Sequence, residues 1–133
     1  MTPDGRILRV LVVDDNRDTA DSLAVLVRMW GHEVQAAYNG SAIHAVPVFK
    51  PDVIVLDIGL PKMDGNSMAR RVRQQAGAGD TLIIAVTGYH DEARRLLSTE
   101  AGVDHYLIKP VDPRVLEKLL LLKVLAKRAA GGT

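Results

Sequence analysis

Four apolar segments of this 133-residue sequence each end in polar side chains that could do chemistry together. The segments are residues 7–13, 53–56, 82–86 and 103–108, and the polar residues that follow them are Asp14 with Asp15, Asp57, Thr87 and Lys109. A single aspartate at a strand end commonly caps a helix or forms a turn. Four such ends favour a shared site instead, because the carboxyl ends of parallel strands meet at one edge of a sheet.

The chemistry that this set could perform is phosphoryl transfer. Three carboxylates in one crevice repel one another unless a cation lies among them, and Mg²⁺ takes carboxylate, water and phosphate oxygens as ligands. A carboxylate such as that of Asp57 can attack phosphorus to form an aspartyl phosphate. Positive charge around the phosphoryl oxygens stabilises that transfer, and the metal and Lys109 would supply it, while Thr87 could donate its hydroxyl. The set predicts a phosphoryl-accepting site with Asp57 as nucleophile.

The elements that must position these residues alternate between strand and helix. Short apolar runs predict strands at 7–13, 53–56, 82–86 and 103–108, and a weaker pattern predicts an edge strand at 33–37. Helical spacing predicts helices at about 18–30, 41–48, 66–75, 91–101 and 113–128, the last with Asp112 as N-cap and Pro113 in its first turn. This alternation predicts an α/β, flavodoxin-like, doubly wound parallel sheet of order 2-1-3-4-5 with helices on both faces.

Composition sets outer limits on the class of protein. With 47% hydrophobic and 25% charged residues, residues 1–133 are expected to form a single soluble domain with a core at about 7–127. A net charge of +1 gives no electrostatic case for binding nucleic acid or membrane. The absence of cysteine excludes disulfides and thiolate metal sites. Arg70, Arg71 and Arg73 of the third helix are interpreted as a solvated basic face, with kinase docking as the alternative.

From Ile7 to Lys127 the sequence resembles the receiver domains of bacterial two-component response regulators. The resemblance rests on Val-Val-Asp-Asp-Asn at 12–16, Leu-Asp-Ile-Gly-Leu-Pro-Lys-Met-Asp-Gly at 56–65, Ala-Val-Thr-Gly at 85–88 and Lys-Pro at 109–110. It implies that Asp57 is the phosphoacceptor and takes phosphate from a histidine kinase or a histidine phosphotransfer protein. It implies a cytoplasmic signalling domain that is not an enzyme, although it assists its own Mg²⁺-dependent phosphorylation and dephosphorylation.

The resemblance also implies roles for the residues around the nucleophile. Mg²⁺ would bind the carboxylates of Asp15 and Asp57 and the main-chain carbonyl of Gly59, while Asp14 would act through a bound water. Thr87 and Lys109 would contact the phosphoryl group, and the Lys109–Pro110 bond would be cis. Thr87 and Tyr106 would form the switch that passes the signal on. Gly59 and Tyr89 are expected to influence the rate of dephosphorylation.

The final predicted helix carries more apolar residues than one buried stripe needs. Together they surround much of the helix, which implies a partner surface; they are Leu116, Leu119, Leu120, Leu121, Leu122, Val124 and Leu125. The resemblance implies a homodimer through the fourth and fifth helices and the fifth strand.

Two other functions remain to be weighed against the phosphoacceptor. A haloacid-dehalogenase-like hydrolase would also use Asp57, but it needs a second aspartate where Gly59 stands. A binding module could keep the fold without accepting phosphate, although the five polar residues are all present. We predict no output domain within residues 1–133, and we expect either a stand-alone protein or a piece of a hybrid histidine kinase.

Overall fold

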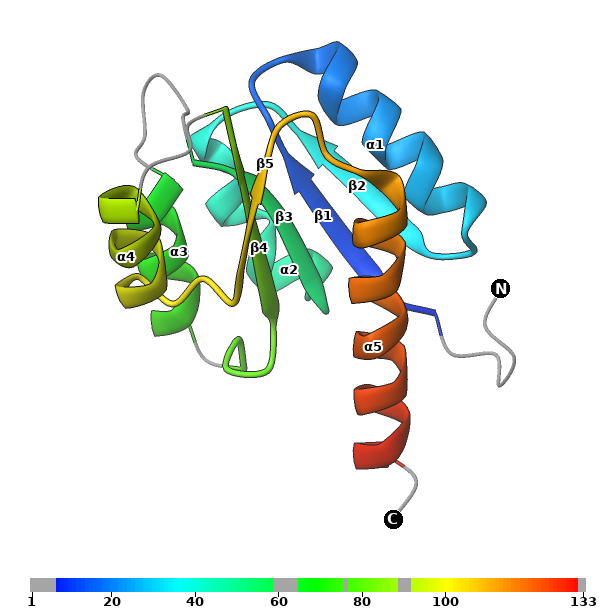
Figure 1. The fold of residues 1–133 in the computed structure, drawn as a ribbon. Coiled ribbons are helices and arrows are strands. Elements are labelled where there is room, and N and C mark those ends of the chain that lie inside the picture. The colour runs from blue at the N-terminus through cyan, green and yellow to red at the C-terminus, as the bar shows by residue number, and fades with distance from the viewer. Residues whose placement is uncertain (1–6, 59–64, 76, 89–91, 132–133) are drawn as a thin grey trace.

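The computed structural model describes residues 7–58, 65–75, 77–88 and 92–131. Its centre is a parallel sheet of five strands in the order β2-β1-β3-β4-β5 (Figure 1). The strands are β1 Arg9–Val13, β2 Glu33–Ala37, β3 Val53–Asp57, β4 Leu82–Thr87 and β5 His105–Ile108. The predicted fold class and strand order are confirmed. All five residues of β3 are buried, as expected for a central strand covered on both faces.

Helices cover both faces of the sheet (Figure 1). On one face, α1 Arg17–Met29 and α5 Pro113–Gly131 pack on alternate strand residues such as Val10, Val55 and Ile84. On the other face, α2 Val46–Phe49, α3 Gly65–Gln74 and the end of α4 Glu92–Glu100 lie against the intervening residues. Because strand side chains alternate in direction, the strands contribute side chains to two separate hydrophobic cores, one on each face of the sheet. Within the described residues, no helix is both long and apolar enough to span a membrane.

The prediction of one continuous helix at 41–48 was wrong. The structure has a 3₁₀ helix at Gly40–His44, followed by the short α2. Pro47 has no N–H, so a helix that ran through it would lose a hydrogen bond and meet the ring sterically. A new helix begins instead with this proline in its first turn.

Other element ends differ from the predictions by a few residues. β5 begins at His105 rather than 103, because residues 102 and 103 close α4: Gly102 is left-handed (φ 99°) and the N–H of Val103 donates to Ser98 O (3.0 Å). Helix α1 begins one residue earlier than predicted, because Asn16 caps it by accepting from the N–H of Thr19.

Candidate functional site

The acidic residues meet at the carboxyl edge of the sheet. Asp57 ends β3, and Asp14 follows β1 directly. By strand alternation both fall on the face of Val55 and Val12, which α1 and α5 cover. Asp14 and Asp57 are 3% and 7% exposed, whereas Asp15 is exposed. Carboxylate oxygens of Asp14, Asp15 and Asp57 lie within 4.8 Å of one another, so the structure brings together the three predicted acidic residues.

Lys109 reaches into this cluster from the end of β5. Its Nζ lies 3.0 Å from Asp14 Oδ2 and 3.3 Å from Asp57 Oδ2. Its main-chain N–H donates to Thr87 O at 2.7 Å, and the Lys109–Pro110 peptide is cis. Burial lowers the pKa of the Lys109 ammonium, but hydrogen bonds and attraction from Asp14 and Asp57 outweigh it, so this pKa lies above its usual value. Lys109 therefore stays protonated at neutral pH.

Local hydrogen bonds orient Asp14. Its Oδ1 accepts from the N–H of Asn16 at 2.9 Å while Oδ2 faces Lys109, and its own N–H donates to Ala37 O at 3.0 Å. Both carboxylate oxygens thus have protein partners. Among the residues that the structure describes, the carboxylate of the exposed Asp15 has no such partner, and one of its oxygens belongs to the cluster.

The donor set suits a hard divalent cation. Three carboxylates converge, and among the described residues Lys109 is the cation paired with Asp14 and Asp57. Oxygen ligands with solvent access on one side are what Mg²⁺ accepts in proteins. Gly59, whose carbonyl was predicted as a further ligand, lies outside the described residues, as does Tyr89.

Thr87 and Tyr106 lie on the opposite face of the sheet from the carboxylates. Thr87 ends β4 and is 2% exposed, and by alternation it shares the face of Ile83 and Ala85. Tyr106 pairs with Ala85 in the β4–β5 ladder and packs, partly buried, against the same cluster. The predicted switch pair is therefore on the side of α3 and α4.

A hollow of about 570 Å³ adjoins Asp14 and Asp57, and it was not predicted from the sequence. Its floor is apolar sheet residues, and its walls come from α1 and from the segment after β5, namely Asp18, Thr19, Ser22, Leu23, Pro110 and Val111. The sequence indicates this hollow only through Thr19 and Ser22. These are two small hydroxyl residues at helical spacing on the side of α1 next to Asp14. They leave space that larger side chains would fill.

A parallel 2-1-3-4-5 sheet with an acidic cluster and a lysine at its carboxyl edge defines a CheY-like signalling domain. The chain belongs to the response regulator receiver domain family, whose model matches residues 10–121.

Curated relatives agree with this family. The chain is 36% identical over 124 residues to the phosphate regulon transcriptional regulatory protein PhoB of Pseudomonas aeruginosa, covering 92% of this chain and 53% of that protein. It is 32% identical over 121 residues to the DNA-binding dual master transcriptional regulator RpaA of Synechocystis, covering 90% and 49%. The chain thus spans about half the length of the curated relatives that it matches.

Solved structures are similar over nearly their whole length. A CheY-like response regulator receiver domain protein from Methanospirillum hungatei superposes with a TM-score of 0.85 at 27% identity, covering 94% of this chain and 99% of that one. The chemotaxis response regulator CheY4 of Vibrio cholerae gives a TM-score of 0.82 at 27% identity, covering 89% and 99%.

Proposed function

We propose that Asp57 accepts a phosphoryl group from a histidine kinase or a histidine phosphotransfer protein. The observation that carries this proposal is the position of Asp57. Its carboxylate is nearly buried, 3.3 Å from the Lys109 ammonium and within 4.8 Å of two further carboxylates. In the transfer, an Asp57 oxygen bonds to phosphorus as the bond from phosphorus to the imidazole nitrogen breaks, and the imidazole leaves.

The surrounding residues would prepare this attack. Asp15 and Asp57, with the carbonyl of Gly59, would hold Mg²⁺, and Asp14 would act through a water because both of its oxygens already have partners. A bound Mg²⁺ supplies positive charge that offsets repulsion between the carboxylates and the incoming phosphoryl oxygens. Lys109 would move its ammonium from Asp57 to a phosphoryl oxygen, and the Thr87 hydroxyl would donate to another.

The same residues support self-catalysed phosphorylation and dephosphorylation within a signalling domain rather than turnover of a separate substrate. A hydrolase of the haloacid dehalogenase kind is disfavoured, since glycine stands at position 59 where its acid would be. We treat residues 7–127 as the core of one domain, without direct contact to nucleic acid or membrane. A cytoplasmic location is part of the proposal, because the ATP that charges histidine kinases is found there.

Phosphorylation would shift a two-state equilibrium through Thr87 and Tyr106. Thr87 ends a strand next to Asp57 but turns to the α3 and α4 face, where Tyr106 is partly buried. Movement of Thr87 toward a phosphoryl group would open space near Tyr106, which could then rotate inward. The surface formed by α4, β5 and α5 would change shape as a result.

This surface has the apolar character of a contact with a second copy of the chain. On α4, Leu96 and Leu97 are 59% and 50% exposed, and on α5, Leu122 and Leu125 are 52% and 46% exposed. A hollow of about 270 Å³, lined by residues of α4, β5 and α5, lies within it. We propose a homodimer through α4, β5 and α5. Sedimentation should give a dimer with a phosphoryl mimic, and a monomer in both states would contradict this.

The phosphoacceptor proposal is tested by intact mass after incubation with Mg²⁺ and a small phosphodonor such as acetyl phosphate. The wild type should gain one phosphoryl group, and Asp57→Asn should gain none. Asp52→Asn is the matched control, because Asp52 lies at the amino-terminal end of β3, opposite Asp57. This variant should gain the phosphoryl group like the wild type. No gain in a folded, Mg²⁺-binding wild type would favour a binding module that does not accept phosphate.

A further inference from the structure

Helix α4 differs from the other long helices in how it is attached. Among its residues 95–100, Ser98 alone is buried, at 1% exposure, while Leu96 and Leu97 face solvent. Helix α5, in contrast, buries Leu116, Leu120 and Val124 completely or nearly so. The described part of α4 therefore gains little stabilisation from apolar burial. Its polar contacts carry correspondingly more of its attachment.

The first of these contacts joins α4 to α3. Ser98 Oγ donates to Asn66 Oδ1 at 2.9 Å, and both residues are buried, Asn66 at 9% exposure. A hydrogen bond between buried side chains is costly to break, because a partner left unpaired loses its interaction without regaining water. Position 98 is therefore held next to position 66 as long as both side chains are present.

Asn66 is connected to the phosphoacceptor through the backbone. It follows Gly65, whose N–H donates to Ile58 O at 3.4 Å, and Ile58 follows Asp57. A Cβ on Gly65 would lie 2.3 Å from Ile58 Cα, so the two backbones touch. The N–H of Ile58 in turn donates to Val86 O at 3.1 Å. Ile58 and Gly65 thus form a line of contact between Asp57 and Asn66 that does not include Thr87 or Tyr106.

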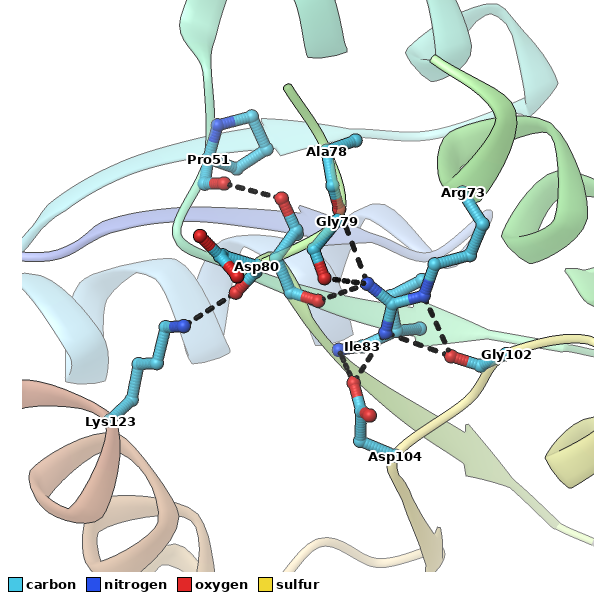
Figure 2. Close-up of polar contacts among 10 residues, drawn as sticks. Pro51, Arg73, Ala78, Gly79, Asp80, Ile83, Gly102, Asp104 and Lys123 are labelled. Carbon is cyan, nitrogen blue, oxygen red and sulfur yellow. Dashed lines mark hydrogen bonds and ion pairs between the residues drawn. The ribbon is translucent and has the colours of Figure 1, made fainter. Parts of the chain in front are cut away.

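The second contact fixes the carboxyl-terminal end of α4 (Figure 2). Arg73 of α3 donates to Gly102 O through Nε at 3.0 Å and through one terminal nitrogen at 2.9 Å, and to Asp104 Oδ2 at 2.6 Å. Asp104 Oδ2 also accepts from the N–H of Ile83, which ties the start of β5 to β4. The other terminal nitrogen of Arg73 faces the carbonyls of residues 78, 79 and 81.

Two attachment points one helical turn apart define the direction of a helix. Arg73 holds the end of α4 at Gly102, and Asn66 holds it at Ser98. We infer that the Asn66–Ser98 hydrogen bond is a second connection between the phosphoacceptor and α4, which keeps α4 in its unphosphorylated position. This inference rests on the proposed function of Asp57. It makes Asn66 and Ser98 positioning residues for the surface that α4 presents.

The reciprocity of coupled equilibria provides the test. If the hydrogen bond favours the unphosphorylated position of α4, removing it must strengthen binding of a phosphoryl mimic at Asp57. The experiment measures the affinity for beryllofluoride with Mg²⁺, by NMR titration of backbone amides, in wild type and in Ser98→Ala. We expect Ser98→Ala to bind about fivefold more tightly, at the low end of typical coupling. A purely structural role of Ser98 would lower stability without changing this affinity.

Two further variants make the test specific. Thr99→Ala is the matched control, since Thr99 is exposed and its hydroxyl donates within α4 to Arg95 O; it should bind like the wild type. Asn66→Ala removes the acceptor of the same hydrogen bond and should also bind more tightly than the wild type. Unchanged affinity in folded Ser98→Ala would overturn the inference. Failure of the wild type to bind beryllofluoride would instead overturn the proposed function.

Discussion

The two faces of the sheet carry different chemistry at the same edge. On the α1 and α5 face, the strand ends present Asp14, Asp57 and Lys109, which form a charged cluster. On the α3 and α4 face lie Thr87, which ends β4, and Tyr106 of β5, which pairs with Ala85, and both are uncharged. A shift of one residue along a strand changes the face of its side chain. The sheet therefore places the charged residues and the predicted switch residues on different faces.

The helices follow the same division. Helix α5 is attached by a buried apolar ridge, whereas the described part of α4 is attached by hydrogen bonds to α3. Apolar contacts tolerate small changes in direction, but a hydrogen bond is lost within a few tenths of an ångström beyond its range. The attachment of α5 therefore depends on apolar burial, whereas that of the described part of α4 depends on specific polar contacts.

The largest effect is expected where charge is removed from the α1 and α5 face. Lys109→Gln should lower the initial rate of phosphoryl uptake from acetyl phosphate about 100-fold, as loss of one well-placed donor to a transition state does. Intact mass against time measures this rate. Lys123→Gln is the control, since Lys123 donates to Asp80 O near the amino-terminal ends of the strands, away from the cluster. Equal rates in the two variants would mean that Lys109 does not take part in the transfer.

A smaller effect is expected on the α3 and α4 face, where Arg73→Met removes the hydrogen bonds that hold the end of α4. The free energy of unfolding in urea should fall by about 2 kcal/mol, because several carbonyls and Asp104 lose their donor. Phosphoryl uptake should persist. Arg71→Met is the control, since Arg71 is an exposed arginine of the same helix, and it should change stability by less than about 0.5 kcal/mol. If both variants were equally stable, the Arg73 contacts would contribute nothing.

Mg²⁺ should stabilise the protein through the charged face. With a dissociation constant of about 1 mM, 10 mM Mg²⁺ would add about 1.4 kcal/mol to the free energy of unfolding. Asp15→Asn removes one predicted ligand and should remove most of this gain, whereas Asp18→Asn, on the nearby first turn of α1, should keep it. Thermal unfolding with and without Mg²⁺ measures the difference. A gain in Asp15→Asn as large as in wild type would exclude Asp15 as a ligand.

The smallest effect concerns His32, at the opposite end of the charged face. Its Nδ1 accepts from the N–H of Leu8 at 3.2 Å, and burial lowers its pKa below the usual value although Asp52 acts in the opposite direction. The unfolded chain therefore binds a proton more readily, so this contribution to stability is complete above about pH 6.5 and is lost as the pH falls below it. Urea unfolding between pH 7.5 and 5.5 should show a smaller loss in His32→Gln than in wild type.

The control for this prediction is His44→Gln, since His44 is exposed. It should show the pH dependence of the wild type. If His32→Gln lost as much stability on acidification as the wild type, another group would be responsible.

Much of the fold was predictable because it depends on local signals. Runs of four to seven residues between glycine, proline and helix caps predicted five parallel strands, and the position of Asp57 after the continuous apolar run at 53–56 indicated a site at the strand ends. The helix predicted at 41–48 was wrong because its periodicity was read through Pro47. The start of β5 was misplaced because Val103, an apolar residue of strand type, closes α4 instead.

The sequence by itself determined the fold class and the acidic residues of the site. Only the tertiary structure decided which polar residues outside this site have hydrogen-bond partners. Arg73 was interpreted as part of a solvated basic face with Arg70 and Arg71, yet it is half-buried and donates two hydrogen bonds to the carbonyl of Gly102, 29 residues away. Ser98 and Asn66, 32 residues apart, carried no signal at all. Periodicity records which face of an element is buried, whereas a hydrogen-bond partner depends on how two elements pack.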